Sequence, residues 1–331
     1  MNRSWRVDGG ILRRKRAATA EPGPGEVLVA MRAAALNYRD LGILAGTYPN
    51  RPGVIALSDG AGIVEAIGPG VEGLATGVAV VSCFYPFWQG GPAGVENHRA
   101  SLGCELNGVL ADHAVLPASA VLAKPAHLDF AEAATLPCAA LTAWTALFTE
   151  GKLRPGHHVL IQGTGGVALF ALQFAVLAGA RATVISSDDS KLARVRAMGA
   201  DGTINYRTTP DWAAAVLDMT AGRGADLILE LGGADTLPIS TRCIAVGGRI
   251  AVIGVLSGLT ASLSVADVLF RHIRLSGVTV GHRNDFAAMN AAVERAVLRP
   301  VIEKRFTFDE APDMYNALPQ GRHFGKLVLE F

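Results

Sequence analysis

The fold is decided by the sequence Val159-Leu160-Ile161-Gln162-Gly163-Thr164-Gly165-Gly166-Val167-Ala168. Three successive apolar residues predict a buried strand, the glycines predict a tight turn, and the apolar run at 169–180 is long enough for a helix. A strand, a glycine turn and a helix form a phosphate site, because glycine lets the backbone approach a pyrophosphate and the helix start offers unpaired N–H groups.

The spacing of this turn is G-x-G-x-x-A, with Ala168 in the third glycine position. An ordinary turn between a strand and a helix is the alternative, but every residue from Gly163 to Gly166 is glycine or threonine. The pattern therefore predicts a dinucleotide-binding turn. Its expected contacts are Gly163, Thr164, Gly165, Gly166 and Val167.

Strands and helices alternate on either side of this turn. The expected strands are 159–162, 182–186, 203–205, 226–231, 249–254 and 275–280, and the expected helices are 169–178, 191–198, 211–220, 236–245 and 265–272. This order predicts an α/β fold with a doubly wound parallel sheet and right-handed crossovers. Residues 1–120 are instead rich in strand patterns, a helical pattern at 130–149 is broken at Pro137, and the tail 327–331 is expected to return to the first domain as a strand.

The composition limits the possible partners and compartments. A length of 331 residues predicts two domains, and a net charge of +1 argues against nucleic acid or an acidic membrane surface as a partner. No apolar run reaches the ~20 residues of a membrane span, and the N-terminus has no apolar signal core. The four cysteines lie far apart and form no C-x-x-C pair, so a cytosolic, reducing compartment fits best.

Several further motifs together resemble a known family. They are Gly25-Glu26-Val27-Leu28-Val29, Leu36-Asn37-Tyr38-Arg39-Asp40, Asp59-Gly60-Ala61-Gly62, Ala133-Ala134-Thr135-Leu136-Pro137-Cys138, Leu141-Thr142-Ala143, Gly247-Gly248-Arg249 and Phe324-Gly325-Lys326. The chain resembles zinc-independent members of the medium-chain dehydrogenase/reductase superfamily, in the quinone-oxidoreductase and enone-reductase branch. The resemblance implies a GroES-like substrate domain at 1–123 and 282–331, with a Rossmann nucleotide-binding domain at 124–281 inserted between them.

The resemblance also bears on zinc. Zinc members of the superfamily carry a Cys where this chain has Asn37, and a His-Glu pair where it has Ser58-Asp59. A catalytic zinc needs three protein ligands of suitable type, so no metal is expected. His98 and His113 near Cys104 are the remaining candidate, and ordinary surface histidines are the favoured interpretation.

The loss of these ligands favours one chemistry over another. Hydride delivery to a simple ketone places charge on one oxygen, which a Lewis acid stabilises, whereas an enone or quinone spreads the charge over a conjugated system. We therefore expect a small conjugated carbonyl or quinone as the substrate. An alcohol dehydrogenase with an unrecognised metal site and a non-catalytic NADPH-binding protein remain as alternatives.

The residues at the end of the strand expected at 182–186 distinguish NADPH from NADH as the cofactor. An NAD site usually has an acidic residue there, whereas this strand ends in Ser186-Ser187, with Lys191 behind it. Hydroxyls and a cation suit a 2′-phosphate, so NADPH is favoured and NADH remains possible. Asp188 and Asp189 either cap the next helix or reach the ribose. By family resemblance, Tyr206 lies near the adenosine phosphate, and plain loop packing is its alternative.

The resemblance implies further site residues. Thr142 would hold the nicotinamide carboxamide, unless its hydroxyl bonds a helix carbonyl. Ile253 and Val255 would line the nicotinamide ring, and Lys326, after Phe324, would reach the cofactor phosphates.

At the substrate, Tyr38 is the candidate proton donor, with solvent as its alternative, and Asn37 could polarise the substrate oxygen. Arg39 and Asp40 are expected to form an ion pair or helix-start contacts. An aromatic cluster at 84–88 would wall a flat pocket or pack under a loop. The apolar edge strand expected at 275–280 predicts a homodimer.

Overall fold

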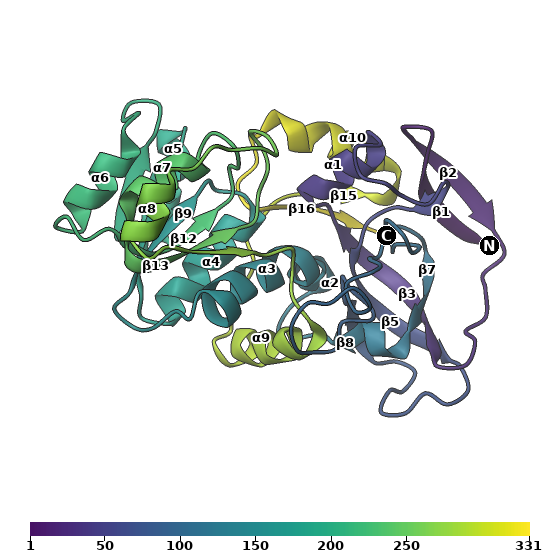
Figure 1. Ribbon diagram of the computed structural model, residues 1–331. Helices are drawn as coiled ribbons and strands as arrows, with labels where there is room; N and C mark the ends of the chain where they lie inside the picture. Colours follow the sequence, from purple (N-terminus) through teal and green to yellow (C-terminus); the bar gives the residue numbers. More distant parts are fainter. The chain divides into compact units, whose positions relative to one another are not determined.

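The computed structural model describes all residues from Met1 to Phe331 and divides into two compact units. Unit 1 consists of residues 1–141 and 281–331, and unit 2 consists of residues 142–280. Both ends of the chain, purple and yellow in Figure 1, therefore belong to one unit. No helix has the length and apolar character needed to cross a membrane.

Unit 2 is built on a six-stranded sheet in which every neighbouring pair is parallel. In spatial order the strands are β11 (Gly202–Asn205), β10 (Arg181–Ser186), β9 (His158–Gln162), β12 (Ala225–Glu230), β13 (Ile244–Val252) and β14 (Arg274–Gly277). The helices are α4 (Gly166–Leu177), α5 (Asp189–Ala197), α6 (Trp212–Met219), α7 (Leu237–Cys243) and α8 (Val265–Phe270). Helices lie on both faces of the sheet (Figure 1), which confirms the expected doubly wound α/β fold.

The central position of β9 follows from its composition. All five of its residues are buried, and it pairs with β10 on one side and β12 on the other. A strand buried on both faces needs continuous apolar side chains, and Val159, Leu160 and Ile161 supply them. This central position places the glycine turn after β9 in the middle of the carboxyl edge of the sheet.

Unit 1 contains a seven-stranded sheet and a smaller one. The path of the larger sheet is β15 (Ile302–Thr307), β16 (Lys326–Glu330), β3 (Glu26–Ala35), β5 (Asp59–Ile67), β6 (Ala79–Ser82) and β8 (Val121–Ala123), with β7 (His113–Pro117) also paired to β3. The smaller sheet contains β2 (Ile11–Ala17), β1 (Asn2–Asp8) and β4 (Val54–Ile55), and the α-helices of this unit are α1 (Tyr38–Leu44), α2 (Phe130–Ala134), α9 (Arg283–Arg295) and α10 (Ala311–Ala317). Because β16 pairs antiparallel with β3, the expected return of the chain end to this unit is confirmed.

Glycine permits the close pairing of β3 with β5. A Cβ atom on Gly62 would lie 2.3 Å from the backbone oxygen of Ala30, which cannot move without breaking the sheet. The pairing register shifts between Leu28 and Val29 and again between Met31 and Ala33. The bends or bulges expected from the glycines of this segment are therefore present in the structure.

Two regions differ from the sequence expectation. Residues Ile11–Ala17 form strand β2, which the sequence analysis did not expect and whose side chains are almost all exposed. Because apolar and polar residues do not alternate in β2, its sequence pattern did not predict a strand. The helical stretch at 130–149 also continues past Pro137, because wide π-helical turns at Leu136–Ala140 and Thr145–Glu150 flank α3 (Leu141–Trp144).

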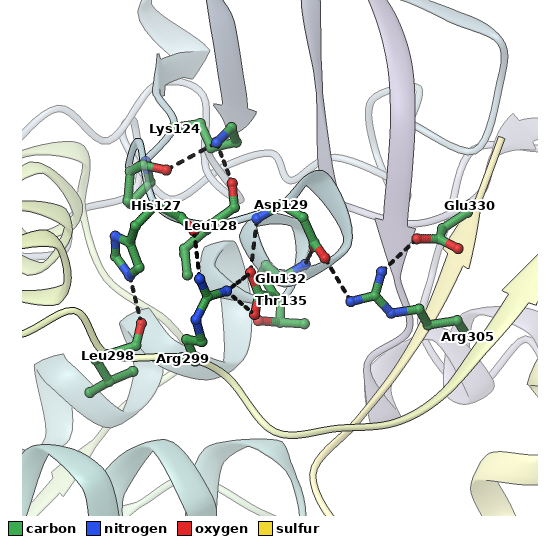
Figure 2. A network of polar contacts seen from close by, with 11 residues as sticks. Lys124, His127, Leu128, Asp129, Glu132, Thr135, Leu298, Arg299, Arg305 and Glu330 are labelled. Atoms are coloured by element: carbon green, nitrogen blue, oxygen red, sulfur yellow. Dashed lines mark hydrogen bonds and ion pairs between the residues drawn. The ribbon is translucent and has the colours of Figure 1, made fainter.

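The unit boundary lies at 141/142, rather than at the expected 123/124. Helix α2 (Phe130–Ala134) and the segment before it are tied to the C-terminal part of the chain, as Figure 2 shows. Arg299 donates to both carboxylate oxygens of Glu132 at 2.8 Å, and Arg305 donates to Asp129 at 2.7 Å and to Glu330 at 2.8 Å. These ion pairs, together with the packing of α2 on β3 and β5, assign α2 to unit 1.

Candidate functional site

The glycine turn has the geometry expected of a phosphate site. Gly163 has a φ of +81°, a conformation that glycine adopts without strain, and its N–H donates to the oxygen of Ile185 at 2.7 Å. Helix α4 follows at once, and no side chain caps its first turn at Gly165. The uncapped N–H groups at the start of this twelve-residue helix leave donors for an anion, as a dinucleotide pyrophosphate requires.

One backbone hydrogen bond joins the residue after β11 to the end of β10. The N–H of Tyr206 donates to the oxygen of Ser186 at 3.1 Å, which places this half-exposed tyrosine beside the strand end. Asp188 caps α5 and accepts from the N–H groups of Ser190 and Lys191 at 2.8 and 3.2 Å, so the capping interpretation of Asp188 is confirmed. The neighbouring Asp189 accepts from the Asn205 amide at 2.8 Å.

Two buried threonines lie beside the π-helical turns. Thr142 is 1% exposed and Thr145 is 6% exposed, and neither hydroxyl has a hydrogen-bond partner. The alternative that Thr142 bonds a helix carbonyl is therefore wrong. Residues three apart share a helix face, so the two hydroxyls are directed to the same side. The sequence analysis missed Thr145, although its three-residue spacing from Thr142 was visible.

A buried carboxylate, also missed from the sequence, organises the carboxyl edge of the sheet in unit 2. Glu230 ends β12, has no exposed surface, and accepts five hydrogen bonds. The donors are the backbone N–H groups of Gly232 and Gly233, the hydroxyls of Thr236 and Ser240, and the amide of Gln162. The network joins the end of β9 to the loop after β12.

The loop after β13 lies against the same network. The backbone oxygen of Glu230 accepts from the N–H groups of Ile253 and Gly254 at 2.9 and 3.0 Å. Ile253 is half-buried and Val255 is exposed. Both residues thus lie at the carboxyl edge of the sheet, where ligands bind in this class of fold.

The side chain of Lys326, which the sequence analysis expected to reach the cofactor phosphates, is buried in unit 1. It is 4% exposed, and its Nζ donates to the backbone oxygen of Leu36 at 2.5 Å and to Oδ1 of Asn37 at 2.6 Å. These bonds hold the ammonium in the interior of unit 1, and its contact with the cofactor phosphates stays a prediction. Phe324, expected at the cofactor, is also buried in this unit.

Asp59 is the fully buried acid of the same cluster. It accepts from the hydroxyl of Ser58 at 2.6 Å and from the backbone N–H of Cys138 at 3.0 Å. Burial raises the pKa of Asp59, and the nearby Lys326 charge and the hydrogen bonds oppose that rise. Burial and the nearby Asp59 raise the pKa of the Cys138 thiol to about 12.

The two residues expected at the substrate differ in exposure. Tyr38 is the first residue of α1 and is 54% exposed, whereas Asn37 is 7% exposed. The amide nitrogen of Asn37 makes no well-formed hydrogen bond, although the amide lies near enough to Asp59 to lower the pKa of that carboxyl. At this turn Tyr38 is therefore the exposed side chain, whereas Asn37 is buried next to Asp59 and Lys326.

Arg39 and Asp40 make the helix-start contacts and the ion pair that were expected. An oxygen of Asp40 accepts from the N–H of Asn37 at 2.8 Å, and the other lies 3.8 Å from Nε of Arg39. Arg39 also donates to the hydroxyl of Ser101 and to the oxygen of Leu102, and its guanidinium lies over the ring of Phe84.

We predict that Asp40 makes the stability of the protein fall as the pH rises. Burial raises the pKa of Asp40 from 3.8 to about 6, partly opposed by Arg39. The folded chain holds more protons between these values, so the contribution is complete below about pH 4 and lost as the pH rises through about 6. Measured by urea unfolding, the free energy of unfolding of Asp40→Asn relative to the wild type should rise by about 1–3 kcal/mol between about pH 4 and about pH 6. A difference that is constant from pH 4.5 to 7.5 would contradict this assignment.

The aromatic residues at 84–88 form a cluster. The ring of Tyr85 lies 4.7 Å from Phe84, 6.0 Å from Trp88 and 4.3 Å from His98, measured between centroids. Phe84 and Trp88 are buried, whereas Phe87 is 38% exposed. The packed-cluster alternative accounts for these contacts.

The structure contains no group of three or more His, Cys, Asp or Glu side chains that could hold a metal ion. His98 lies on Tyr85, His113 pairs with Glu65 at 2.8 Å, and the thiol of Cys104 donates to the oxygen of Pro49 at 3.3 Å. The candidate His98–His113–Cys104 site is therefore not assembled.

Comparison with known proteins identifies the family. Residues 23–126 match the family model described as the alcohol dehydrogenase GroES-like domain, and residues 166–295 match the zinc-binding dehydrogenase model. A zinc-type alcohol dehydrogenase-like protein of Schizosaccharomyces pombe is 45% identical over 317 residues, which cover 93% of this chain and 91% of the relative. The chain belongs to the medium-chain dehydrogenase/reductase superfamily. It is therefore related to oxidoreductases, and its β-rich unit contains a GroES-like domain.

Two solved structures similar to this chain are described with different cofactors. A protein described as an NAD-dependent alcohol dehydrogenase is 34% identical, with a TM-score of 0.91 and coverage of 99% of both chains. The 2-octenoyl-CoA carboxylase reductase CinF, solved with NADP and 2-octenoyl-CoA, is 25% identical, with a TM-score of 0.88 and coverage of 99% of this chain and 87% of the other.

The zinc named by the family model does not fit the residues of this chain. The positions that resemble zinc-ligand positions hold Asn37, Ser58 and Asp59, and the ammonium of Lys326 binds Asn37 directly. Zinc is bound by thiolate, imidazole and carboxylate, and of these three positions only Asp59 offers one. The carboxylate is already bound by a hydroxyl and a backbone N–H.

Proposed function

We propose that this protein is an NADPH-dependent, zinc-independent oxidoreductase that reduces quinones or α,β-unsaturated carbonyls by hydride transfer. The observation that carries this proposal is the buried cluster of Asn37, Asp59 and Lys326, which offers an amide and an ammonium but too few metal ligands. Such groups suit a substrate whose developing charge is spread over a conjugated system. The CinF relative, solved with an enoyl thioester, lends support to this substrate class.

The proposed preference for NADPH rests on the end of β10. Ser186, Ser187 and Lys191 supply hydroxyls and a cation for a 2′-phosphate, while Asp188 and Asp189 are engaged in other hydrogen bonds. Use of NADH remains the alternative, since the more similar solved relative is described as NAD-dependent. Steady-state kinetics should give a lower KM for NADPH than for NADH, and the reverse order would overturn this preference.

The bound cofactor would supply the hydride. The chain would hold the pyrophosphate at the glycine turn after β9 and the carboxamide at the unpartnered hydroxyl of Thr142, beside Ile253 and Val255. In unit 1, Tyr38 would donate the proton that completes reduction, with solvent as the alternative donor. The hydroxyl of Thr142 has no hydrogen-bond partner in the structure, and Tyr38 and Val255 are exposed, which supports these roles.

Alcohol oxidation is the second candidate, because the Schizosaccharomyces pombe relative is described as alcohol dehydrogenase-like and one solved relative as an NAD-dependent alcohol dehydrogenase. The decisive experiment follows NADPH oxidation with a panel of enones and quinones, with and without a chelator, and measures zinc in the purified protein. We expect turnover that the chelator leaves unchanged. Chelator inactivation reversed only by Zn²⁺ would favour the alcohol dehydrogenase, and NADPH binding without any turnover would favour a non-catalytic protein.

Removal of the phenol from Tyr38 tests its role as a proton donor. Tyr38→Phe should lower kcat by about 10²-fold, in the range of general acid catalysis, with little change in stability because the side chain is half-exposed. The matched control is Tyr48→Phe, since Tyr48 lies beside Gly42 of the same helix and is 44% exposed. An unchanged kcat in Tyr38→Phe would assign the proton to solvent.

We propose that the protein forms a homodimer through the edge of the unit 2 sheet. Strand β14 has a neighbour only on its β13 side, and α8 buries none of its residues. On this helix Val265 is 79% exposed, Leu269 is 61% exposed and Phe270 is 75% exposed. Light scattering should give a dimer at micromolar concentration, weakened by Leu269→Arg. A monomeric wild type would overturn the assignment.

The proposed compartment is the cytoplasm. All four cysteines are free thiols in the structure, which suits a reducing environment.

A further inference from the structure

The ammonium of Lys326 has an unused donor. A lysine ammonium carries three N–H donors, and the structure assigns two of them, to the oxygen of Leu36 and to Oδ1 of Asn37. Both bonds are short and charge-assisted, so they hold the nitrogen in place. Burial of a cation with incomplete hydrogen bonding is costly, and such an arrangement points to a further acceptor.

Several elements converge to hold this charge. Lys326 begins β16, Asn37 precedes α1, Asp59 begins β5, and Cys138 lies in the π-helical turn. Asp59 and Asp40 supply the opposite charge, and Arg39 adds a second cation next to Asp40. The cluster reaches the surface at the exposed Tyr38 and the partly exposed Cys138.

We propose that Lys326 supplies the fixed positive charge of the substrate site and stabilises the oxyanion formed during reduction. The inference rests on the proposed function. Hydride addition forms a C–H bond at the β-carbon of an enone, the π electrons move to the carbonyl oxygen, and the nicotinamide is oxidised. A proton from Tyr38 or solvent then completes the product. The ammonium faces the oxygen on which charge develops, the part that a Lewis-acid metal plays in a zinc enzyme.

Two other roles for Lys326 make different predictions. A contact with the cofactor phosphates would appear as a loss of NADPH affinity. A purely structural role, as the countercharge of Asp59, would disappear once Asp59 is made neutral, because the buried acid then needs no cation. If Lys326 stabilises the oxyanion, its removal should leave the NADPH affinity unchanged, and a neutral Asp59 variant should not restore the activity.

The experiment compares Lys326→Met with the double variant Lys326→Met/Asp59→Asn, which removes both charges and protects the fold. Both should reduce enones with a kcat about 10²–10³-fold below wild type, while the Kd for NADPH stays within about twofold. Lys326→Arg should recover part of the kcat because it retains the charge. Lys304→Met, an exposed lysine on the neighbouring strand β15, is the control and should match the wild type.

Recovery of wild-type kcat in the double variant would overturn the proposal in favour of a structural role. A weakened NADPH Kd with an unchanged kcat would overturn it in favour of a phosphate contact. Wild-type protein that reduces no enone or quinone would instead refute the proposed function.

A binding measurement that needs no catalytic turnover also tests the role of Lys326. The probe is 4-nitrophenol, whose phenolate resembles the enolate and absorbs in the visible range. When it is bound to the wild type, its ionisation should shift to lower pH by about one unit, because a nearby cation favours the anion. The shift should be absent in the double variant. No shift in the wild type, or an equal shift in both proteins, would overturn the role of Lys326 whatever the activity shows.

Discussion

Gly254→Ala is expected to destabilise unit 2 by about 3 kcal/mol or more and to abolish dinucleotide binding. A Cβ atom at this position would lie 1.9 Å from the oxygen and 2.5 Å from the carbon of the Leu231 carbonyl group. Both atoms belong to the backbone and cannot rotate away. The N–H of Gly254 also donates to the oxygen of Glu230, so the loops after β12 and β13 would have to separate. Ile253 and Val255, proposed to line the nicotinamide, would move with them.

Urea unfolding and fluorescence titration with NADPH measure the two effects of Gly254→Ala. The control is Gly94→Ala in unit 1, where an added Cβ meets no atom closer than 3.7 Å. This control should stay within about 0.5 kcal/mol of the wild type and bind NADPH normally. Equal stability and affinity in the two variants would show that the loops tolerate separation.

Glu230→Ala should cost about 3–5 kcal/mol, the range for breaking a buried charged network. The substitution removes the acceptor of five hydrogen bonds in a position without exposed surface. The amide of Gln162 and the backbone of Gly232 and Gly233 would lose that partner, so the carboxyl edge of the sheet should loosen. We therefore expect a lower midpoint in urea and a weaker affinity for NADPH.

Two variants calibrate this prediction. Glu230→Gln keeps the shape but turns an NH₂ group toward donors, so its loss of stability should lie between the wild type and Glu230→Ala. Asp218→Ala removes an exposed acid from α6 in the same unit and should change stability by less than about 0.5 kcal/mol. If Glu230→Ala unfolds at the wild-type urea concentration, Glu230 does not hold the loops.

The sequence predicted unit 2 well because its signals are local. Each strand of a doubly wound sheet is a short apolar run, and each crossover helix follows within a few residues, as in the segment from β9 through the glycine turn to α4. The hairpin of β1 and β2 was missed because the side chains of β2 are exposed and basic. The unit boundary was misplaced because α2 is held by Arg299 and Arg305, more than 160 residues away in the chain.

Sequence alone determined the class of fold, the position of the glycine turn after β9 and the superfamily, since each depends on residues that are neighbours in the chain. Only the tertiary structure decided which polar groups meet. Lys326 and Asn37 are 289 residues apart and touch because β16 pairs with β3, whose end leads directly into Asn37. Gln162 and Glu230 are 68 residues apart and meet because β9 and β12 are adjacent in the sheet. Strand pairing sets these contacts, and no local spacing encodes it.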